Sequence, residues 1–309
     1  MQLKKITLVS RISLLAMWQA EYVKAKLLAL YPALEIEIKG IKTTGDKLLD
    51  VSLTKMGGKG LFVTELREAL LNKTADIAVH SLKDMPAILE PQLKIAAVLE
   101  REDARDAFVS EHYSHVNDIP AYARVGTSSL RRQSQLLRLR ADLNTLPLRG
   151  NVDTRLAKLK KGEFDAIILA AAGLKRLNLQ AHVQHYFEPS EMLPAIGQGA
   201  LAIECREDNT ILQEYLKPLH HLSTYFCVTA ERALSEVLGG SCELPLAGLA
   251  SLETEEILML QAKICSPDGK EMITAQHQGS IHDPILLGKT VAKSLLAQGA
   301  ERIIQQCKF

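Results

Sequence analysis

The 309-residue chain lacks the features of membrane, secreted and zinc-binding proteins. It has no uninterrupted apolar run long enough to cross a bilayer. Its five cysteines are odd in number, scattered and without CxxC spacing, which argues against a disulfide framework and a zinc site. Arg11 interrupts the apolar segment after Lys4 and Lys5, and no small-residue cleavage site follows, so we expect no signal peptide. These absences predict a cytoplasmic protein without membrane or metal partners.

An excess of charge of one sign is also missing, because the formal net charge is only +1. A local bias exists nevertheless: residues 124–161 contain ten Lys and Arg against Asp142 and Asp153. The same stretch contains no Phe, Tyr or Trp, whereas proteins that bind single-stranded nucleic acid interleave aromatic side chains for base stacking. We therefore predict no nucleic-acid partner and expect small anions to bind at this local cluster.

The length and the order of apolar segments predict an α/β fold with two hinged lobes and a small α+β domain at the C-terminal end. The predicted domains are residues 1–99 with 200–217 for the first, 105–193 for the second and 222–309 for the third.

Two segments of the sequence are expected to connect the lobes. Residues 100–106 are dense in both charges, which suits a solvated hinge. Residues 193–204 are punctuated by Gly and Pro and then strand-like, which indicates a return to the first lobe. Two crossings are typical of a two-lobed binder with its ligand in the cleft between the lobes.

The segment 76–86 is the centre of the functional prediction. Residues 77–79 form a short apolar run typical of a buried strand, and Pro86 biases the residue before it away from helix. Lys83 and Asp84 therefore follow the carboxyl end of a strand, where open α/β sheets bind ligands. A neighbouring cation keeps a carboxylate ionised. The alternative is an ordinary loop with a capping Asp and a solvated Lys.

Arginines recur at other predicted strand ends. Arg11 and Ser13 lie between a strand near residues 6–9 and a helix expected over residues 14–30. Guanidinium groups pair with carboxylates through two parallel hydrogen bonds, so this pattern favours small carboxylates over nucleic acid. Strand, turn and helix-start patterns carry the further candidates Thr127, Ser129, Arg131, Arg132, Arg149, Arg155 and Arg176. The alternative for Arg11 is a surface cation, and the alternative for the arginines of residues 124–161 is a basic surface. Arg176 could instead complement the helix dipole near a helix end.

Two glycine-rich loops complete the candidates. Residues 55–62 include Lys55, Lys59 and Phe62 among three glycines, and the lysines could close over an anion. The loop lacks the GxxxxGK[ST] pattern of a nucleotide-binding loop. Cys242 follows two glycines and a serine, where a thiol could carry a covalent attachment. The alternative for any single cysteine is a small buried hydrophobic residue.

Taken together, these motifs resemble the porphobilinogen deaminase (hydroxymethylbilane synthase) family over essentially the whole chain. The resemblance is carried by residues 55–62, 76–84, 126–132, 148–152, 193–200 and 240–242. It implies a monomeric, cytoplasmic enzyme of heme and tetrapyrrole biosynthesis that condenses four porphobilinogen molecules head to tail, releases ammonia, and hydrolyses the product to hydroxymethylbilane. The alternative is a non-catalytic two-lobed binding module for a dicarboxylate.

The resemblance also implies that the two lobes look like those of a periplasmic-type binding protein. It further implies a dipyrromethane cofactor joined by a thioether to Cys242, with Asp84 as the catalytic carboxylate. Its implied cofactor-binding residues are Cys242, Lys83, Asp84, Ser81, Thr127, Ser129, Arg131, Arg132 and Gln198. Its implied substrate-binding residues are Arg11, Ser13, Arg149, Arg155 and Arg176, with Lys55, Lys59 and Phe62 on a flexible loop. Two positions depart from the family pattern: Ile12 replaces a polar residue, and Asp153 replaces a common glycine.

Overall fold

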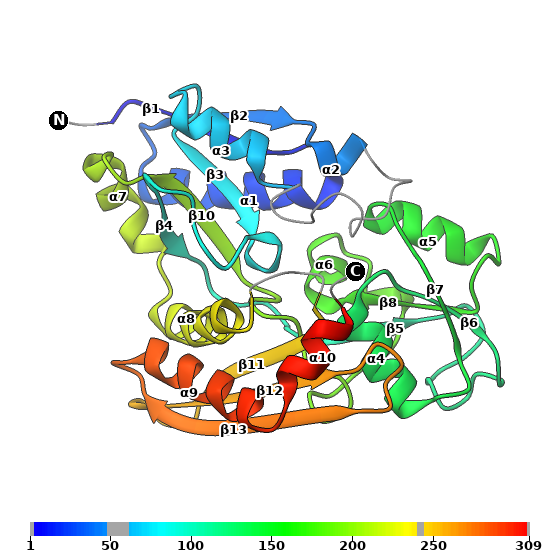
Figure 1. The fold of residues 1–309 in the computed structure, drawn as a ribbon. Helices are drawn as coiled ribbons and strands as arrows, with labels where there is room; N and C mark the ends of the chain where they lie inside the picture. Colours follow the sequence, from blue (N-terminus) through cyan, green and yellow to red (C-terminus); the bar gives the residue numbers. More distant parts are fainter. Residues whose placement is uncertain (1–2, 48–61, 240–243, 308–309) are drawn as a thin grey trace.

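The computed structural model describes residues 3–47, 62–239 and 244–307. Within these residues the chain forms two five-stranded sheets and one three-stranded sheet (Figure 1). The first sheet lies at the top of Figure 1, the second at the right and the third at the bottom. No helix among these residues has the length and apolarity needed to span a bilayer. The predicted fold class, α/β with two lobes and a small third domain, is confirmed.

Lobe 1 is built on a sheet with the strand order β2-β1-β3-β10-β4. Its first three strands are parallel, and β10 runs antiparallel to both of its neighbours. The elements are β1 (Lys5–Arg11), α1 (Leu14–Leu30), β2 (Glu35–Ile41), α2 (Thr44–Lys47), α3 (Thr64–Leu71), β3 (Ile77–Ser81), the 3-10 helix η2 (Leu82–Asp84), β4 (Leu93–Val98), β10 (Leu201–Arg206), α7 (Thr210–Leu216) and η4 (Lys217–Leu219).

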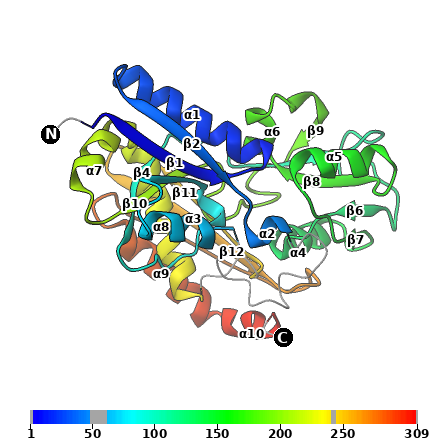
Figure 2. The ribbon, with the colours of Figure 1, turned by 90° about the horizontal axis from the view of Figure 1, so that it is seen from above.

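The two faces of this sheet bury different helices because successive side chains of a strand point to opposite sides. Ile77 and Val79 of β3 pack with α1, whereas Ala78 packs with α3. Figure 2 shows α1 lying along the sheet, with its C-terminal neighbour β2 beside β1. The helix predicted over residues 14–30 matches α1. Ser13 caps the first turn of this helix and so fixes where it begins.

Lobe 2 repeats this plan with the strand order β7-β6-β8-β5-β9. β6 is parallel to β7 and β8, and β5 is antiparallel to β8 and β9. In each lobe, therefore, the one antiparallel strand next to the parallel set is the strand that enters from the other lobe. The elements are β5 (Asp106–Val109), β6 (Arg124–Gly126), α4 (Leu130–Leu139), β7 (Asn144–Leu146), α5 (Val152–Lys160), β8 (Ala166–Ala170), α6 (Ala171–Arg176), η3 (Gln180–His182) and β9 (Val183–Tyr186).

The third domain packs three helices on an antiparallel sheet with the order β11-β12-β13. Its elements are α8 (Leu222–Val237), β11 (Leu246–Leu252), β12 (Ile257–Cys265), β13 (Met272–Ser280), α9 (Pro284–Ala297) and α10 (Ala300–Gln306). The last helix, α10, starts after Gly299. That glycine has φ +94°, a conformation that most other residues avoid. The exact boundaries between the three domains stay a prediction.

The two crossings between the lobes are hydrogen-bonded to each other. The Glu102 N–H donates to the Gly199 carbonyl at 3.1 Å, and Arg101 Nε donates to the Gln198 carbonyl at 2.8 Å. A Cβ on Gly199 would lie 2.2 Å from the Glu102 oxygen, so this close approach requires glycine. The hinge is therefore a paired element rather than two independent linkers.

Glu231 of α8 ties the third domain to both crossings. Its fully buried carboxylate accepts from Arg101 Nη1 at 2.6 Å and from the Gly197 N–H at 2.7 Å, and it also accepts from the Ala250 N–H at 2.9 Å. The prediction of a solvated hinge over residues 100–106 is thus wrong in part. Asp106 is fully buried. The side chain of Arg101 is largely buried and pairs with the fully buried carboxylate of Glu231.

Candidate active site

A cavity of about 280 Å³ lies between the lobes, where the parallel strands of both sheets end. Within the described parts of the chain, six cationic side chains and three carboxylates line it. The cations are Arg11, Lys83, Arg132, Arg149, Arg155 and Arg176, and the carboxylates are Asp46, Asp84 and Asp153. This surplus of positive charge favours an anionic ligand. The structure therefore brings together most of the site residues that the sequence predicted.

Lobe 1 supplies Asp84 to the cavity. The buried strand β3 ends at Ser81, and η2 then carries Lys83 and Asp84 into the space between the lobes. Gln19 Nε2 donates to Ser81 Oγ at 2.9 Å, which orients the hydroxyl at the strand end. Lys83 Nζ donates to Gln198 Oε1 at 3.3 Å, so this turn is linked to the second crossing.

Arg11 and Ser13 occupy the neighbouring turn of lobe 1, between β1 and α1. Ser13 Oγ accepts from the Ala16 N–H at 3.3 Å and so caps the helix. Arg11 forms an ion pair with Asp46, and its guanidinium lies 4.2 Å from the centre of the Phe62 ring. The cavity-lining Asp46 is a carboxylate that sequence reasoning missed.

Lobe 2 supplies Arg149 from the turn between β7 and α5, Arg155 from the first half of α5, and Arg176 from the end of α6. Arg155 Nε donates to the Gly150 carbonyl at 2.7 Å, and Arg176 Nη2 donates to the Gly199 carbonyl at 2.7 Å. Among the described residues, each of these two guanidinium groups is held by a single side-chain hydrogen bond, which leaves its other nitrogens to the cavity. Gly150 has φ +110°, so the turn that carries Arg149 and Arg155 depends on glycine. Asp153 lies in the first turn of α5 and adds a carboxylate to this wall.

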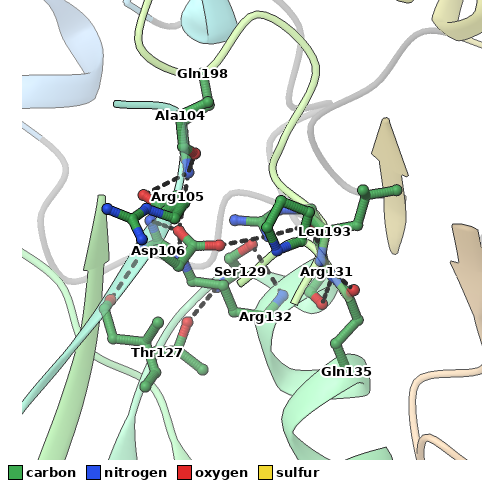
Figure 3. A network of polar contacts seen from close by, with 12 residues as sticks. Ala104, Arg105, Asp106, Thr127, Ser129, Arg131, Arg132, Gln135, Leu193 and Gln198 are labelled. Atoms are coloured by element: carbon green, nitrogen blue, oxygen red, sulfur yellow. Dashed lines mark hydrogen bonds and ion pairs between the residues drawn. The ribbon is translucent and has the colours of Figure 1, made fainter. Parts of the chain in front are cut away.

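A buried carboxylate organises the basic start of α4 (Figure 3). Asp106 Oδ2 accepts from Arg131 Nη1 at 2.7 Å, and Asp106 Oδ1 accepts from Arg132 Nε at 3.0 Å. Gln198 Nε2 donates to the same Oδ1 at 3.0 Å. Two guanidinium groups could not be buried together without such a counterion. Sequence reasoning missed Asp106 because it stands at the end of a charged run that is typical of a solvated segment.

The predicted contacts of this turn divide into two kinds. Arg132 lines the cavity, whereas Thr127, Ser129 and Arg131 do not, and Thr127 and Arg131 are buried. Ser129 Oγ accepts from the Arg132 N–H at 3.4 Å as the helix cap, and Thr127 Oγ1 accepts from the Ser129 N–H at 3.2 Å. Direct contact of these three residues with a ligand stays a prediction. Ser128, which the sequence did not single out, lines the cavity instead.

Burial and mutual charge shift the acidity of these groups. Burial, followed by the positive charge of Arg132, lowers the pKa of Lys83 from 10.5 to about 8. Burial likewise lowers the pKa of Arg155 to about 10, an effect that the charge of Asp84 opposes. Burial alone would raise the pKa of Asp106, but Arg131 and Arg132 outweigh it and hold that pKa well below 3.8. The cavity wall is thus electrostatically crowded with positive charge.

Three predicted residues, Lys55, Lys59 and Cys242, lie outside the described residues. Phe62 is described and lines the cavity. Of the residues that the structure describes, one group could hold a metal ion, namely His115, His185 and Glu191, whose ligand atoms lie within 4.8 Å of one another. None of the three lines the cavity, so the site described above involves no metal ligands from this group.

The fold and cavity define a two-lobed α/β protein with a cavity between its lobes that is lined by more cations than carboxylates. A profile described as "Porphobilinogen deaminase, dipyromethane cofactor binding domain" matches residues 6–214, and "Porphobilinogen deaminase, C-terminal domain" matches residues 225–297. Among solved structures, the methionine-binding protein MetQ is 12% identical, covers 72% of this chain and 92% of its own, and gives a TM-score of 0.46.

Curated relatives agree with the profiles. The chain is 52% identical over 301 residues to the porphobilinogen deaminase of Nitrosomonas europaea, with 97% of each chain covered. It is 54% identical over 300 residues to that of Chromobacterium violaceum, again with 97% of each covered. The chain belongs to the porphobilinogen deaminase family. It is an enzyme of tetrapyrrole biosynthesis with a dipyrromethane cofactor domain, and the alternative of a non-catalytic binding module is not favoured.

Proposed function

We propose that this enzyme joins four porphobilinogen molecules head to tail, releases one ammonia for each, and hydrolyses the product to hydroxymethylbilane. The observation that carries the proposal is that Asp84 of lobe 1 lines the same cavity as four arginines of lobe 2. These arginines, Arg132, Arg149, Arg155 and Arg176, form the cationic wall of lobe 2. Each pyrrole ring of the substrate carries an acetate and a propionate, so a growing chain of rings requires several cationic partners. The six cations of the cavity supply them.

The residues present suit a covalently held dipyrromethane. The cavity has more cations than carboxylates, and Arg131 Nε is buried without a hydrogen-bond partner among the described residues. Lys83, Arg132 and Gln198 would hold the carboxylates of its rings, with support from Ser81, Thr127, Ser129 and Arg131. Cys242 would form the thioether. When bound, this group supplies the free pyrrole carbon to which the first substrate is joined.

Asp84 is the proposed catalytic residue. In each condensation a bond forms between the methylene carbon of the substrate and a ring carbon of the growing chain. That ring carbon loses a proton, and the departing amine gains one and leaves as ammonia. Positive charge develops on pyrrole nitrogens during the exchange, and a fixed carboxylate in a partly enclosed cavity stabilises it where it develops. Asp84 would also help to move the proton.

The remaining cavity residues would orient the incoming substrate. Arg11, Arg149, Arg155 and Arg176 would bind its carboxylates, and Ser13 would add a neutral hydrogen bond. Because Arg155 and Arg176 are each held by a backbone carbonyl, their free edges are preorganised for this task. Lys55 and Lys59, with Phe62, would contribute from the neighbouring glycine-rich segment.

We also propose that the enzyme works as a cytoplasmic monomer without a nucleic-acid partner. The four described cysteines, Cys205, Cys227, Cys265 and Cys307, are free thiols, which suits a reducing compartment. Size-exclusion chromatography with light scattering checks the monomer, and oligonucleotide titration at low salt checks the last point.

Incubation with porphobilinogen tests the proposed reaction. We expect release of one ammonia for each porphobilinogen consumed, together with a linear tetrapyrrole. The linear product closes with loss of water to a porphyrinogen, which oxidation then converts to a detectable porphyrin. Saturable binding of porphobilinogen without ammonia release would contradict the proposal. The same assay on Asp84→Asn protein checks that ammonia release comes from this site.

A further inference from the structure

Arg11 is held in the cavity by a carboxylate of its own chain. Its Nε donates to Asp46 Oδ2 at 3.3 Å, and its Nη2 donates to Asp46 Oδ1. The two bonds are parallel, which is the two-point geometry that a guanidinium also offers to a ligand carboxylate. Both side chains are largely buried, and both residues line the cavity between the lobes.

The carboxylate of Asp46 is itself held in place by Thr43. Its Oδ2 accepts from the Thr43 N–H at 3.1 Å and from Thr43 Oγ1 at 2.8 Å, and Thr43 is fully buried. Burial alone would raise the pKa of Asp46, but the hydrogen bonds from Arg11 and Thr43 outweigh it and lower that pKa. The carboxylate is therefore a rigid, negatively charged support and not a surface side chain that happens to lie near a cation.

The face of the guanidinium is also supported. Arg11 Cζ lies 4.2 Å from the centre of the Phe62 ring. A Cβ added to Gly45 would lie 2.3 Å from a carbon of the same ring. The ring thus packs directly on the backbone of Gly45 and under Arg11. A cation over an aromatic face is attracted to the ring, and the attraction is stronger when the cation is desolvated.

One edge of Arg11 remains for a ligand. The Nε and Nη2 atoms of Arg11 donate to Asp46, and the face of its guanidinium group lies over the Phe62 ring. The third nitrogen, Nη1, has no hydrogen-bond partner among the described residues. We propose that Asp46 is a positioning residue, which holds Arg11 so that its Nη1 edge meets a carboxylate of the incoming porphobilinogen. This inference rests on the proposed function, because it assigns a role within that same site.

The contrary role would be competition. If the substrate carboxylate had to displace Asp46 from Arg11, removal of Asp46 would tighten substrate binding. The geometry favours positioning, because Asp46 is locked by Thr43 and occupies the edge of Arg11 away from Nη1. The two roles predict opposite changes in KM.

Steady-state kinetics with porphobilinogen test the proposal in Asp46→Ala and Asp46→Asn. A misplaced charged hydrogen bond costs about 1.5–3 kcal/mol, so we expect KM to rise about 10- to 100-fold in Asp46→Ala, with kcat changed by less than about threefold. Asp46→Asn keeps one acceptor oxygen, so its KM should rise less. A fall in KM in either variant would overturn the proposal.

A double-mutant cycle separates positioning from a structural role. In an Arg11→Gln background, Asp46→Ala should produce no further rise in KM, because Asp46 acts through Arg11. Additive effects of the two substitutions would also overturn the proposal. Asp165→Asn is the matched control, since it breaks a comparable pair with Arg124 outside the cavity and should leave KM unchanged.

The failure of this inference and that of the proposed function are distinguishable. If the wild-type protein releases no ammonia from porphobilinogen, the proposed function fails. If the wild type turns over and the cycle is additive, only the role of Asp46 fails. Denaturation midpoints of all variants show whether a fall in the apparent kcat reflects loss of folded protein, which would leave KM unchanged.

Discussion

The two lobes share one topology and differ in the chemistry of their turns. Each sheet places its parallel strands in the same order and receives an antiparallel strand from the other lobe. In lobe 1 the turn after β3 presents a carboxylate, Asp84, whereas lobe 2 presents Arg132 from α4, Arg149 from the turn after β7 and Arg176 from the end of α6. The comparison teaches that the repeated topology determines where the side chains of the two lobes meet. The identity of those side chains then determines which lobe supplies the carboxylate Asp84 and which supplies most of the arginines.

The lobes also differ in how they tolerate buried charge. Lobe 2 places Arg131 and Arg132 side by side and neutralises them with Asp106. Lobe 1 pairs Arg11 singly with Asp46 and buries a separate cluster in which Arg67 and His80 contact Glu204. We infer that the cationic wall of lobe 2 depends on one carboxylate far more than the wall of lobe 1 does.

The largest effect is expected for Asp106→Asn. Breaking a buried ion pair by removing one partner costs about 3–5 kcal/mol, so the free energy of unfolding should fall by that amount. The pKa of Asp106 is lowered in the folded state, so its contribution is present above about pH 3.8 and is lost as the pH falls below that value. Chemical denaturation at pH 7 and at pH 3 measures both effects.

Asp165→Asn is the control for this prediction. Its pair with Arg124 is partly exposed, so the same substitution should cost about 1 kcal/mol or less. Equal destabilisation of the two variants would break the distinction between a buried and a peripheral carboxylate in lobe 2.

The next effect concerns Asp84→Asn, which removes the carboxylate of lobe 1. Loss of a preorganised electrostatic group costs about 10²–10³-fold in kcat, and we expect a fall of that size with a small change in KM. Asp153→Asn removes a carboxylate from the lobe 2 wall of the same cavity and should lower kcat far less. Similar losses in both variants would remove the special role of Asp84.

A smaller effect is expected for Arg149→Gln in lobe 2. A charged hydrogen bond contributes about 1.5–3 kcal/mol, so KM should rise about 10- to 100-fold while kcat changes less. Arg138→Gln is the control, because Arg138 lies on the exposed side of α4 and donates to the Lys270 carbonyl. A loss of kcat with unchanged KM in Arg149→Gln would contradict the division of work between the lobes.

The smallest effect is a pH dependence carried by Lys83. Its folded pKa of about 8 means that the ammonium is charged below this pH and neutral above it. Affinity for carboxylates should therefore weaken as the pH rises through 8, and KM should increase by about tenfold or less between pH 7 and 9. In Lys83→Arg the guanidinium stays charged, so this limb of the KM profile should disappear. If KM still rises between pH 7 and 9 in Lys83→Arg, the pH dependence belongs to another ionisable group.

Local pattern in the sequence predicted the elements and the turn positions well. The helix over residues 14–30 follows from its apolar spacing and the Ser13 cap, and the turn after residues 77–79 follows from a buried strand that ends in polar residues. Because parallel strands end at one edge of a sheet, candidates at strand ends converge in one cavity.

The partners of these residues could not be predicted in the same way. Asp106 lies 25 residues from Arg131, and Asp46 lies 35 residues from Arg11, so neither pair leaves a local signal. The charged run that ends at Asp106 has the composition of a solvated segment, and only tertiary packing reveals that its last residue is buried. Counterion choice is decided by the fold and not by local propensity.

Intact-mass spectrometry of Asp84→Asn protein before and after incubation with porphobilinogen tests the central claim most directly. The account predicts that the variant carries an adduct of two pyrrole rings on Cys242, absent from Cys242→Ser, and adds no further rings at the wild-type rate. An Asp84→Asn protein that lengthens its adduct as fast as wild type would contradict it.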